Sequence, residues 1–111
     1  MTSDSFFLGL SRDLLTDEGK PSFGESPLLL LDGERRIRWE FIPESVHEIT
    51  PDIMERYDGI HINTPTVTRA SLTGAKRRVR IVSRHGVGYD SVDVAALAEN
   101  GIITTNTPVA I

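Results

Sequence analysis

The chain contains no cysteine, so it forms neither disulfides nor thiolate-based zinc sites. Aromatic residues make up only 6% of its 111 residues. The apolar run near the N-terminus, Phe6–Leu10, is too short for a signal peptide or a membrane span. These absences lead us to expect a cytoplasmic protein that is stabilised by packing alone and has no membrane partner.

Charge is low overall and unevenly distributed. The net charge is −4, but residues 1–63 carry 13 acidic and 6 basic side chains, whereas residues 64–111 carry 3 acidic and 6 basic ones. The basic run from Arg69 to Arg84 has no interleaved aromatic residue for base stacking. It indicates a solvated face or an anion-attracting edge, and we expect no nucleic-acid partner.

Short apolar segments alternate with helix-like segments along the chain. We expect strands at Phe6–Leu10, Ile37–Phe41, 60–62, 79–82 and 102–105, and helices at 25–31, 50–57, 67–74 and 94–98. This alternation favours right-handed crossovers and a parallel sheet that is covered on both sides. We therefore predict a single α/β domain, a flavodoxin-like doubly wound sheet of five strands in the order 2-1-3-4-5. In the second strand, Trp39 is expected to face the core with Ile37 and Phe41.

Several residues are expected to begin or end these helices. Thr50 is a predicted N-cap followed by proline at the first helical position. Thr66 is the expected cap of the helix at 67–74. Either Ser91 or Asp93 caps the last helix, which Gly101 should end.

The segment between the fourth strand and the last helix reads Arg84-His85-Gly86-Val87-Gly88-Tyr89-Asp90-Ser91-Val92-Asp93. Its two glycines allow positive φ and let a ligand approach bare N–H groups, and the nearby helix start favours an anion. The dinucleotide fingerprint is not met, because Ser91 occupies the place of its third glycine. From the residues alone, an anion cradle and a turn that merely connects strand to helix both remain open.

This segment carries a family resemblance. Arg84-x-Gly86-x-Gly88-x-Asp90-x-Val92-Asp93, followed by Asn100-Gly101-Ile102 and Thr105-Asn106-Thr107-Pro108, resembles the end of the substrate-binding domain of the D-isomer-specific 2-hydroxyacid dehydrogenases, which include phosphoglycerate dehydrogenases. The resemblance is densest over residues 59–108. It implies that residues 1–108 form a substrate-binding domain and that residues 109–111 begin the crossing to a nucleotide-binding domain outside this chain.

The resemblance also implies a reaction. In the whole enzyme, expected to be a homodimer, a hydride would pass between NAD or NADP and a small 2-hydroxy or 2-keto acid. The other domain would bind the cofactor and supply the catalytic residues. We therefore expect no catalytic residue, no cofactor site and no activity in this chain alone, and the histidines and acids show no metal-ligand spacing.

The predicted substrate-binding residues follow the third and fourth strands, at the edge of the sheet where ligands bind in such folds. They are Asn63, Thr64, Arg84, His85, Gly86, Val87 and Gly88. By resemblance, the backbone N–H groups of Val87 and Gly88 hold the substrate carboxylate. Arg84 adds positive charge there or pairs with Asp90. His61 is interpreted as a packed or hydrogen-bonded strand residue.

The alternative interpretation is a non-catalytic flavodoxin-like module, either a receiver or a ligand sensor. A receiver needs clustered acids after the first strand and an aspartate after the third. Here Asp13 stands nearly alone, and the third strand leads into Asn63. A flavin-binding module would need a phosphate loop rich in serine and threonine after the first strand, and residues 11–15 are a weak substitute.

Overall fold

The computed structural model describes residues 5–21, 24, 26–74, 78–85 and 91–106, which contain a five-stranded sheet. Its strands are β1 (Phe6–Leu10), β2 (Ile37–Phe41), β3 (Gly59–Ile62), β4 (Ile81–Arg84) and β5 (Ile103–Thr105). They lie in the order β2-β1-β3-β4-β5, and every neighbouring pair is parallel. The predicted α/β architecture and strand order are therefore confirmed.

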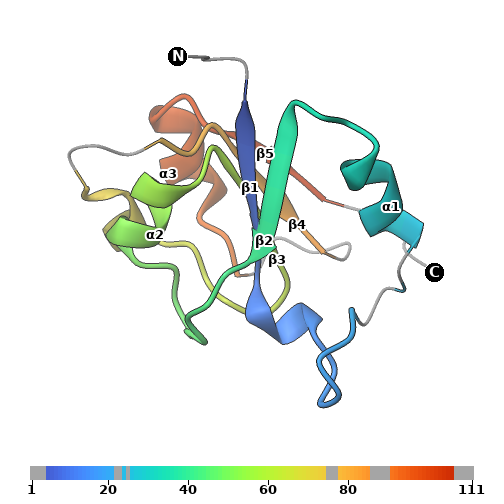
Figure 1. Cartoon of the computed structure of the whole chain (residues 1–111). Helices are drawn as coiled ribbons and strands as arrows, with labels where there is room; N and C mark the ends of the chain where they lie inside the picture. The colour runs from blue at the N-terminus through green and yellow to red at the C-terminus, as the bar shows by residue number, and fades with distance from the viewer. Residues whose placement is uncertain (1–4, 22–23, 25, 75–77, 86–90, 107–111) are drawn as a thin grey trace.

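Helices cover both faces of this sheet. The helices are α1 (Ser26–Asp32), α2 (Pro51–Arg56) and α3 (Val94–Glu99), with short 3-10 turns η1 (Arg12–Leu14) and η2 (Arg69–Leu72). Figure 1 shows α2 and α3 on one side of the sheet and α1 alone on the other, beside β2. Within the described residues, none of these helices has the length and apolar character needed to cross a membrane.

The main core lies between the sheet and the layer of α2, η2 and α3. Tyr57, at the end of α2, is fully buried there, and its ring lies 4.8 Å from the ring of Phe7. Gly9 makes this approach possible, since a Cβ atom at that position would lie 2.9 Å from Cδ2 of Tyr57. The Tyr57 hydroxyl donates a 2.5 Å hydrogen bond to Glu40 on β2. Together these contacts fix α2 to the two strands at that side of the sheet.

The opposite face of the sheet is more open. Ile37, Trp39 and Phe41 share this face, as predicted, but they are only half-buried and lie outside the main core. The prediction that they face that core is wrong, because strand register places them on the side of α1. There the Trp39 Nε1 atom donates a 2.8 Å hydrogen bond to Asp32 at the end of α1.

The predicted ends of two helices are confirmed. Thr50 is the N-cap residue of α2 and Pro51 is its first residue. Asp93 caps α3, since its carboxylate accepts a 2.9 Å hydrogen bond from the amide of Ala96. Gly101 follows this helix with φ of 72°, a conformation that glycine adopts without steric cost.

The helix predicted at 67–74 is wrong, because only the 3-10 turn η2 forms there. Val67 is held in an extended conformation by Val92, with which it forms a parallel bridge. Helical structure therefore begins only after Thr68, whose side chain accepts a 3.1 Å hydrogen bond from the amide of Ala70. Thr66 is not the cap: its hydroxyl donates to the carbonyl of His47.

The fourth strand begins two residues later than predicted, at Ile81 instead of residue 79. The amides of Arg78 and Val79 both donate to the carbonyl of Met54 in α2. These two residues therefore bind the helix layer before the chain enters the sheet. The strand also ends later than predicted, at Arg84. Arg84 is the first residue of the segment of residues 84–93, which contains two glycines and is called the glycine segment below.

Candidate functional site at the carboxyl edge of the sheet

Because all the strands are parallel, their carboxyl ends lie at one edge of the sheet, and Figure 1 shows β1 reaching this edge at the bottom of the view. The connections that leave the neighbouring strands β1 and β3 run in opposite directions, toward β2 and toward β4, so the topological switch point lies between β1 and β3. Ligands of doubly wound sheets bind outside the carboxyl ends at this point. Residues 11–13 after β1 and residues 63–66 after β3 lie there, as the sequence predicts.

A carboxylate joins these two exits. Asp13 accepts a 2.6 Å hydrogen bond from the Ser11 hydroxyl at one oxygen. Its other oxygen accepts two hydrogen bonds from Thr64, from the backbone amide at 2.9 Å and from the hydroxyl at 2.7 Å. The amide of Asn63 donates to the buried Ser11 hydroxyl at 3.1 Å. Both predicted residues after β3 are thus fixed to the loop after β1, an arrangement we call the Asp13 latch.

The latch keeps Asp13 ionised. Partial burial acts to raise the pKa of its carboxyl group, but the hydrogen bonds from Ser11 and Thr64 outweigh burial and leave the pKa below its ordinary value. At neutral pH this side chain is a carboxylate whose oxygens are occupied by donors from the protein. It therefore positions the loop after β3 and is poorly suited to act as a general base.

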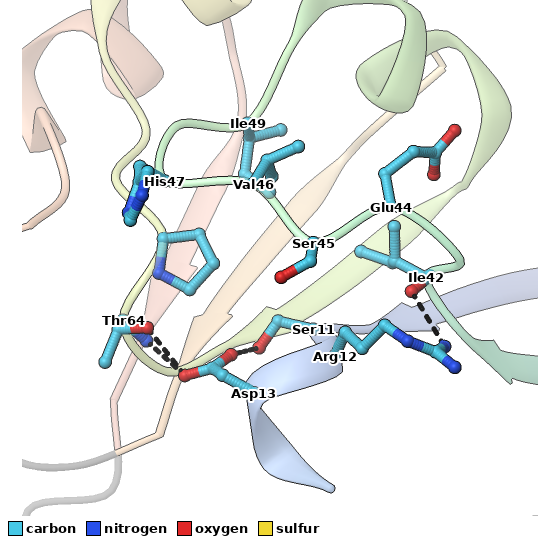
Figure 2. A pocket seen from close by; sticks show the side chains of 11 residues that line it. Ser11, Arg12, Asp13, Ile42, Glu44, Ser45, Val46, His47, Ile49 and Thr64 are labelled. Atoms are coloured by element: carbon cyan, nitrogen blue, oxygen red, sulfur yellow. Dashed lines mark hydrogen bonds between the residues drawn. The ribbon is translucent and has the colours of Figure 1, made fainter.

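Above the latch lies an open pocket of about 120 Å³ (Figure 2). Ser11, Arg12 and Asp13 form one side of it, and Thr64 and Pro65 another. The remaining wall is the segment of residues 42–49, which leaves β2 and includes both apolar side chains and the imidazole of His47. The volume of the pocket is smaller than the roughly 300–1,000 Å³ of typical small-molecule sites.

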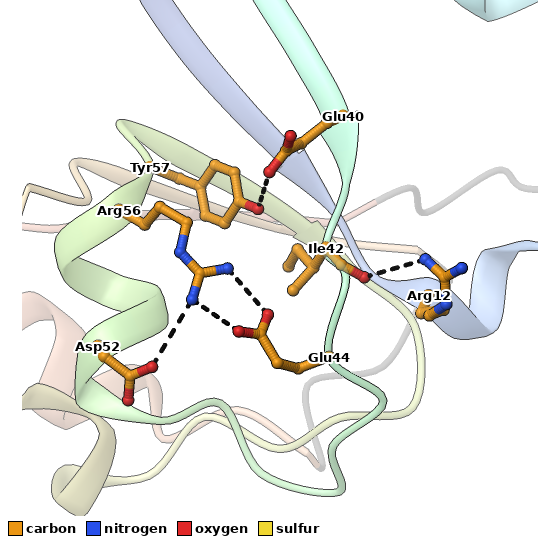
Figure 3. A network of polar contacts seen from close by, with 7 residues as sticks. All are labelled: Arg12, Glu40, Ile42, Glu44, Asp52, Arg56 and Tyr57. Atoms are coloured by element: carbon orange, nitrogen blue, oxygen red, sulfur yellow. Dashed lines mark hydrogen bonds and ion pairs between the residues drawn. The ribbon is translucent and has the colours of Figure 1, made fainter.

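Ion pairs hold this wall against α2 (Figure 3). Arg56 donates two hydrogen bonds to Glu44, at 2.8 and 2.7 Å, and lies 3.6 Å from Asp52. The hydrogen bonds from Arg56 lower the pKa of Glu44. On the other side, Arg12 reaches the carbonyl of Ile42 at 3.5 Å. The charged side chains around the pocket are therefore largely engaged with the protein itself.

The two ends of the glycine segment are fixed beside the same loop. At one end, the amide of His85 donates to the carbonyl of Ile62 at 2.7 Å. At the other, the amide of Val67 donates to the carbonyl of Ser91 at 2.9 Å. Arg84 joins the ends directly, since its Nε atom donates to the Ser91 hydroxyl at 3.2 Å and a terminal nitrogen donates to the His85 carbonyl. The predicted residues Gly86, Val87 and Gly88, and the possible partner Asp90, lie outside the described residues.

Two histidines meet on the face of the sheet that carries α1. His61 on β3 bonds through Nδ1 to the Ser83 hydroxyl at 2.9 Å and through Nε2 to Nδ1 of His85 at 3.4 Å. The two rings are perpendicular, with centroids 5.5 Å apart. Burial, followed by the charges of His85 and Arg84, lowers the pKa of His61 to about 4. His61 is therefore neutral at physiological pH, and its interpretation as a hydrogen-bonded strand residue agrees with these contacts.

The sequence located part of this edge and missed part. Thr64 lines the pocket, Asn63 precedes it and is bonded to Ser11, and Arg84 and His85 are at the start of the glycine segment. Ser11, Asp13 and the wall at residues 42–49 were not among the predicted site residues. Asp13 lies three residues after the end of the first strand, which is a usable signal, whereas nothing in the composition of residues 42–49 indicates a pocket wall. The described part of the chain holds no group of three or more potential metal ligands.

The fold and this edge define a doubly wound α/β domain with a small open pocket at its switch point. The chain belongs to the D-isomer specific 2-hydroxyacid dehydrogenases: the model of the catalytic domain of that family matches residues 11–111. This result confirms the family predicted from the glycine segment. It also removes the ground for the receiver or sensor alternative.

Individual relatives agree with this assignment. The chain is 28% identical, over 120 aligned residues, to D-3-phosphoglycerate dehydrogenase 2 of Arabidopsis thaliana, covering 99% of the chain and 19% of that protein. It is 37% identical to a glyoxylate reductase of Thermococcus gammatolerans over 79 residues, 68% of the chain and 20% of that protein. The chain thus spans about a fifth of the length of these relatives.

Solved structures resemble it in fold. A protein of Pyrococcus horikoshii superimposes with a TM-score of 0.69 at 26% identity, covering 92% of the chain and 27% of that structure. The apo-structure of D-lactate dehydrogenase from Escherichia coli gives 0.66 at 16% identity, over 93% of the chain and 31% of that structure. The second likeness concerns the fold alone.

Proposed function

We propose that this chain is the substrate-binding part of an NAD(P)-dependent D-2-hydroxyacid dehydrogenase. The observation that carries the proposal is the match of residues 11–111 to the catalytic domain of that family. In the whole protein, a hydride passes between the nicotinamide and C2 of a small 2-hydroxy or 2-keto acid. The cofactor and the proton-transfer groups belong to the nucleotide-binding domain that the sequence predicts beyond this chain.

In this proposal the segment from Arg84 to Gly88 holds the carboxylate of the acid, through the backbone N–H groups of Val87 and Gly88. Two findings support it. Hydrogen bonds fix the flanking residues His85 and Ser91 beside the loop after β3. That edge also has the small open pocket, which Thr64 and Pro65 line. Holding the acid at one end orients C2 toward the second domain and so contributes to the rate.

The test uses the full-length protein. Its turnover is measured with a series of 2-keto acids of increasing length, each with NADH and NADPH, by the loss of reduced-nicotinamide absorbance. We expect reduction of at least one of these acids, and no turnover and little NAD affinity for residues 1–111 alone. Absence of turnover by the full-length protein with every acid, or turnover by residues 1–111, contradicts the proposal.

A glycine substitution tests the carboxylate cradle. Gly88→Ala in the full-length protein is expected to raise the KM for the 2-keto acid more than the KM for the nucleotide, because a Cβ atom crowds the amides that bind the carboxylate. Gly33→Ala is the matched control, since an added Cβ there meets only carbonyl oxygens of α1 at 3.5 Å. An unchanged KM for the acid in Gly88→Ala would count against the cradle.

A further inference from the structure

The pocket at the switch point has two different ends. Figure 2 shows Arg12 at one end, beside the carbonyl of Ile42, and Thr64 with Asp13 at the other. Ser45 lies on the wall between these ends. The pocket volume of about 120 Å³ is several times the roughly 10–15 Å³ that one water molecule needs. The pocket therefore suits a polar group of several non-hydrogen atoms.

The acidic side chains that line the pocket already have their donors. Asp13 accepts three hydrogen bonds from Ser11 and Thr64, and a carboxylate offers roughly four acceptor positions. Glu44 directs its carboxylate toward Arg56, from which it accepts two hydrogen bonds (Figure 3). Both carboxylates are thus largely saturated by the protein, and neither depends on a donor from a ligand.

The donors that line the pocket are in the opposite situation. A guanidinium group carries five N–H donors. Within the residues that the structure describes, Arg12 forms no ion pair, and its one hydrogen bond is the long contact of 3.5 Å with the Ile42 carbonyl. Among the same residues, the Ser45 hydroxyl has no hydrogen-bond partner. The pocket therefore has more donors than acceptors, and its end at Arg12 carries a positive charge that no described carboxylate neutralises.

A guanidinium group in this situation selects a particular kind of ligand. Its planar fork matches the two oxygens of a carboxylate or phosphate group, and such charge-assisted hydrogen bonds are roughly twice as strong as neutral ones. An exposed arginine on a convex surface would simply be solvated. Arg12 differs because it lines a concave site at the switch point, where ligands of doubly wound sheets bind.

We propose that this pocket binds a small oxyanion, a carboxylate or phosphate group, through the guanidinium of Arg12 and the hydroxyl of Ser45. The negative charge of Asp13 disfavours an anion at the other end of the pocket, so the oxyanion lies at the end with Arg12. The inference depends on the side chains of the pocket alone. It requires neither the proposed reaction nor the carboxylate cradle of the glycine segment.

Calorimetry on the full-length protein tests the site, with inorganic phosphate and malonate as probes. The wild type should bind at least one of them, and Arg12→Gln should lower that affinity about tenfold or more, the effect of losing hydrogen bonds from a charged group. Arg12→Lys should keep part of the affinity, because it retains the charge without the fork. Arg35→Gln is the matched control, since Arg35 is an exposed arginine outside the pocket, and it should bind like the wild type.

Two further measurements define the chemistry of the site. Ser45→Ala should weaken oxyanion binding less than Arg12→Gln does, because it removes a neutral donor. Calcium chloride is the cation probe, and we expect no binding of Ca²⁺ that depends on Asp13. Binding of Ca²⁺ to the wild type that disappears in Asp13→Asn would identify a cation site at the same pocket and would overturn the inference.

Kinetics of the full-length protein distinguish two sources of the oxyanion. If it is part of the substrate, phosphate should raise the KM for the 2-keto acid in the wild type and have little effect on that KM in Arg12→Gln. If it is a separate ligand, phosphate should leave this KM unchanged while its binding still depends on Arg12. Either result supports the site.

The calorimetric result decides the inference. Equal affinities of the wild type and Arg12→Gln for both probes, or no binding of either probe by the wild type, overturns it. Because binding is measured without turnover, this outcome is distinguishable from failure of the proposed reaction. If no 2-keto acid is reduced but oxyanion binding depends on Arg12, the proposed reaction fails and the site stands.

Discussion

Removing the carboxylate of Asp13 is expected to release the loop after β3 from the loop after β1. Asp13 accepts hydrogen bonds at 2.6, 2.9 and 2.7 Å from Ser11 and Thr64. A hydrogen bond to a charged group contributes about 1.5–3 kcal/mol when it is sheltered from water. Asp13 lies at the surface and its carboxylate is only partly removed from water, so solvent screening reduces the sum, and we expect Asp13→Ala to lower the free energy of unfolding by about 1–2 kcal/mol.

The effect has a defined pH dependence. The pKa of Asp13 lies below its ordinary value of 3.8 in the folded protein. A depressed pKa contributes stability that is fully present above the unfolded value and is lost as the pH falls through the folded one. The difference between the wild type and Asp13→Asn should therefore be constant near neutral pH and should shrink as the pH falls below 3.8.

Urea unfolding followed by the fluorescence of Trp39, the only tryptophan in the chain, measures both effects. Asp17→Ala is the control, because Asp17 is an exposed aspartate in the same connection. If Asp13→Ala and Asp17→Ala unfold at the same urea concentration at neutral pH, the latch does not stabilise this edge and the reasoning is wrong.

Two further predictions concern the packing of α2 on the sheet. Gly9→Ala should destabilise the fold by about 1–3 kcal/mol, because the new Cβ would lie 2.9 Å from the buried ring of Tyr57. Combining Gly9→Ala with Tyr57→Leu should recover part of this loss. If Gly9→Ala alone leaves the free energy of unfolding unchanged, the close approach is contradicted. Burial, followed by the hydrogen bond to the Glu40 carboxylate, raises the pKa of Tyr57 to about 12. Its contribution to stability is therefore complete below pH 10 and is lost as the pH rises through 12. Ultraviolet titration of the wild type against Tyr57→Phe checks this, and a tyrosine signal near pH 10 that disappears in the variant would refute it.

The strand order was predictable because each strand is a short apolar run between turn residues. Parallel strands joined by helical crossovers leave few topologies, and right-handed connections select among them. The failed helix at 67–74 has a different cause. Val67 pairs with Val92, a residue 25 positions away, and that long-range backbone contact overrides the local preference. No local sequence pattern indicates such a contact.

The orientation of β2 shows a second limit. Alternation along the strand correctly groups Ile37, Trp39 and Phe41 on one face. It does not say which of two helix layers that face meets, because apolar side chains suit either. The register of β2 on β1 decides this, since it places Trp39 beside Leu8, on the face opposite Phe7 and Tyr57.

The site was predictable as an edge but not as a set of contacts. Once the strand order is known, the residues after β1, β3 and β4 must lie at the same edge of the sheet, which is where the sequence placed Asn63, Thr64 and His85. The contacts of Thr64 with Asp13 and of His61 with His85 depend on the register between strands, which fixes the sequence positions that meet. Register follows from packing of the whole sheet, and a one-residue slip would move His61 to the other face.

The described polar groups of this edge share one property that bears on how it binds an acid. The Asp13 carboxylate is occupied by Ser11 and Thr64, and Arg84 is engaged by Ser91 and by the carbonyl of His85. Side chains bound in this way cannot turn toward a ligand without losing a hydrogen bond, so they position the backbone around them. A rigid edge of this kind reduces the entropy lost on binding. It favours recognition of the acid by fixed donors, which is the role proposed for the glycine segment.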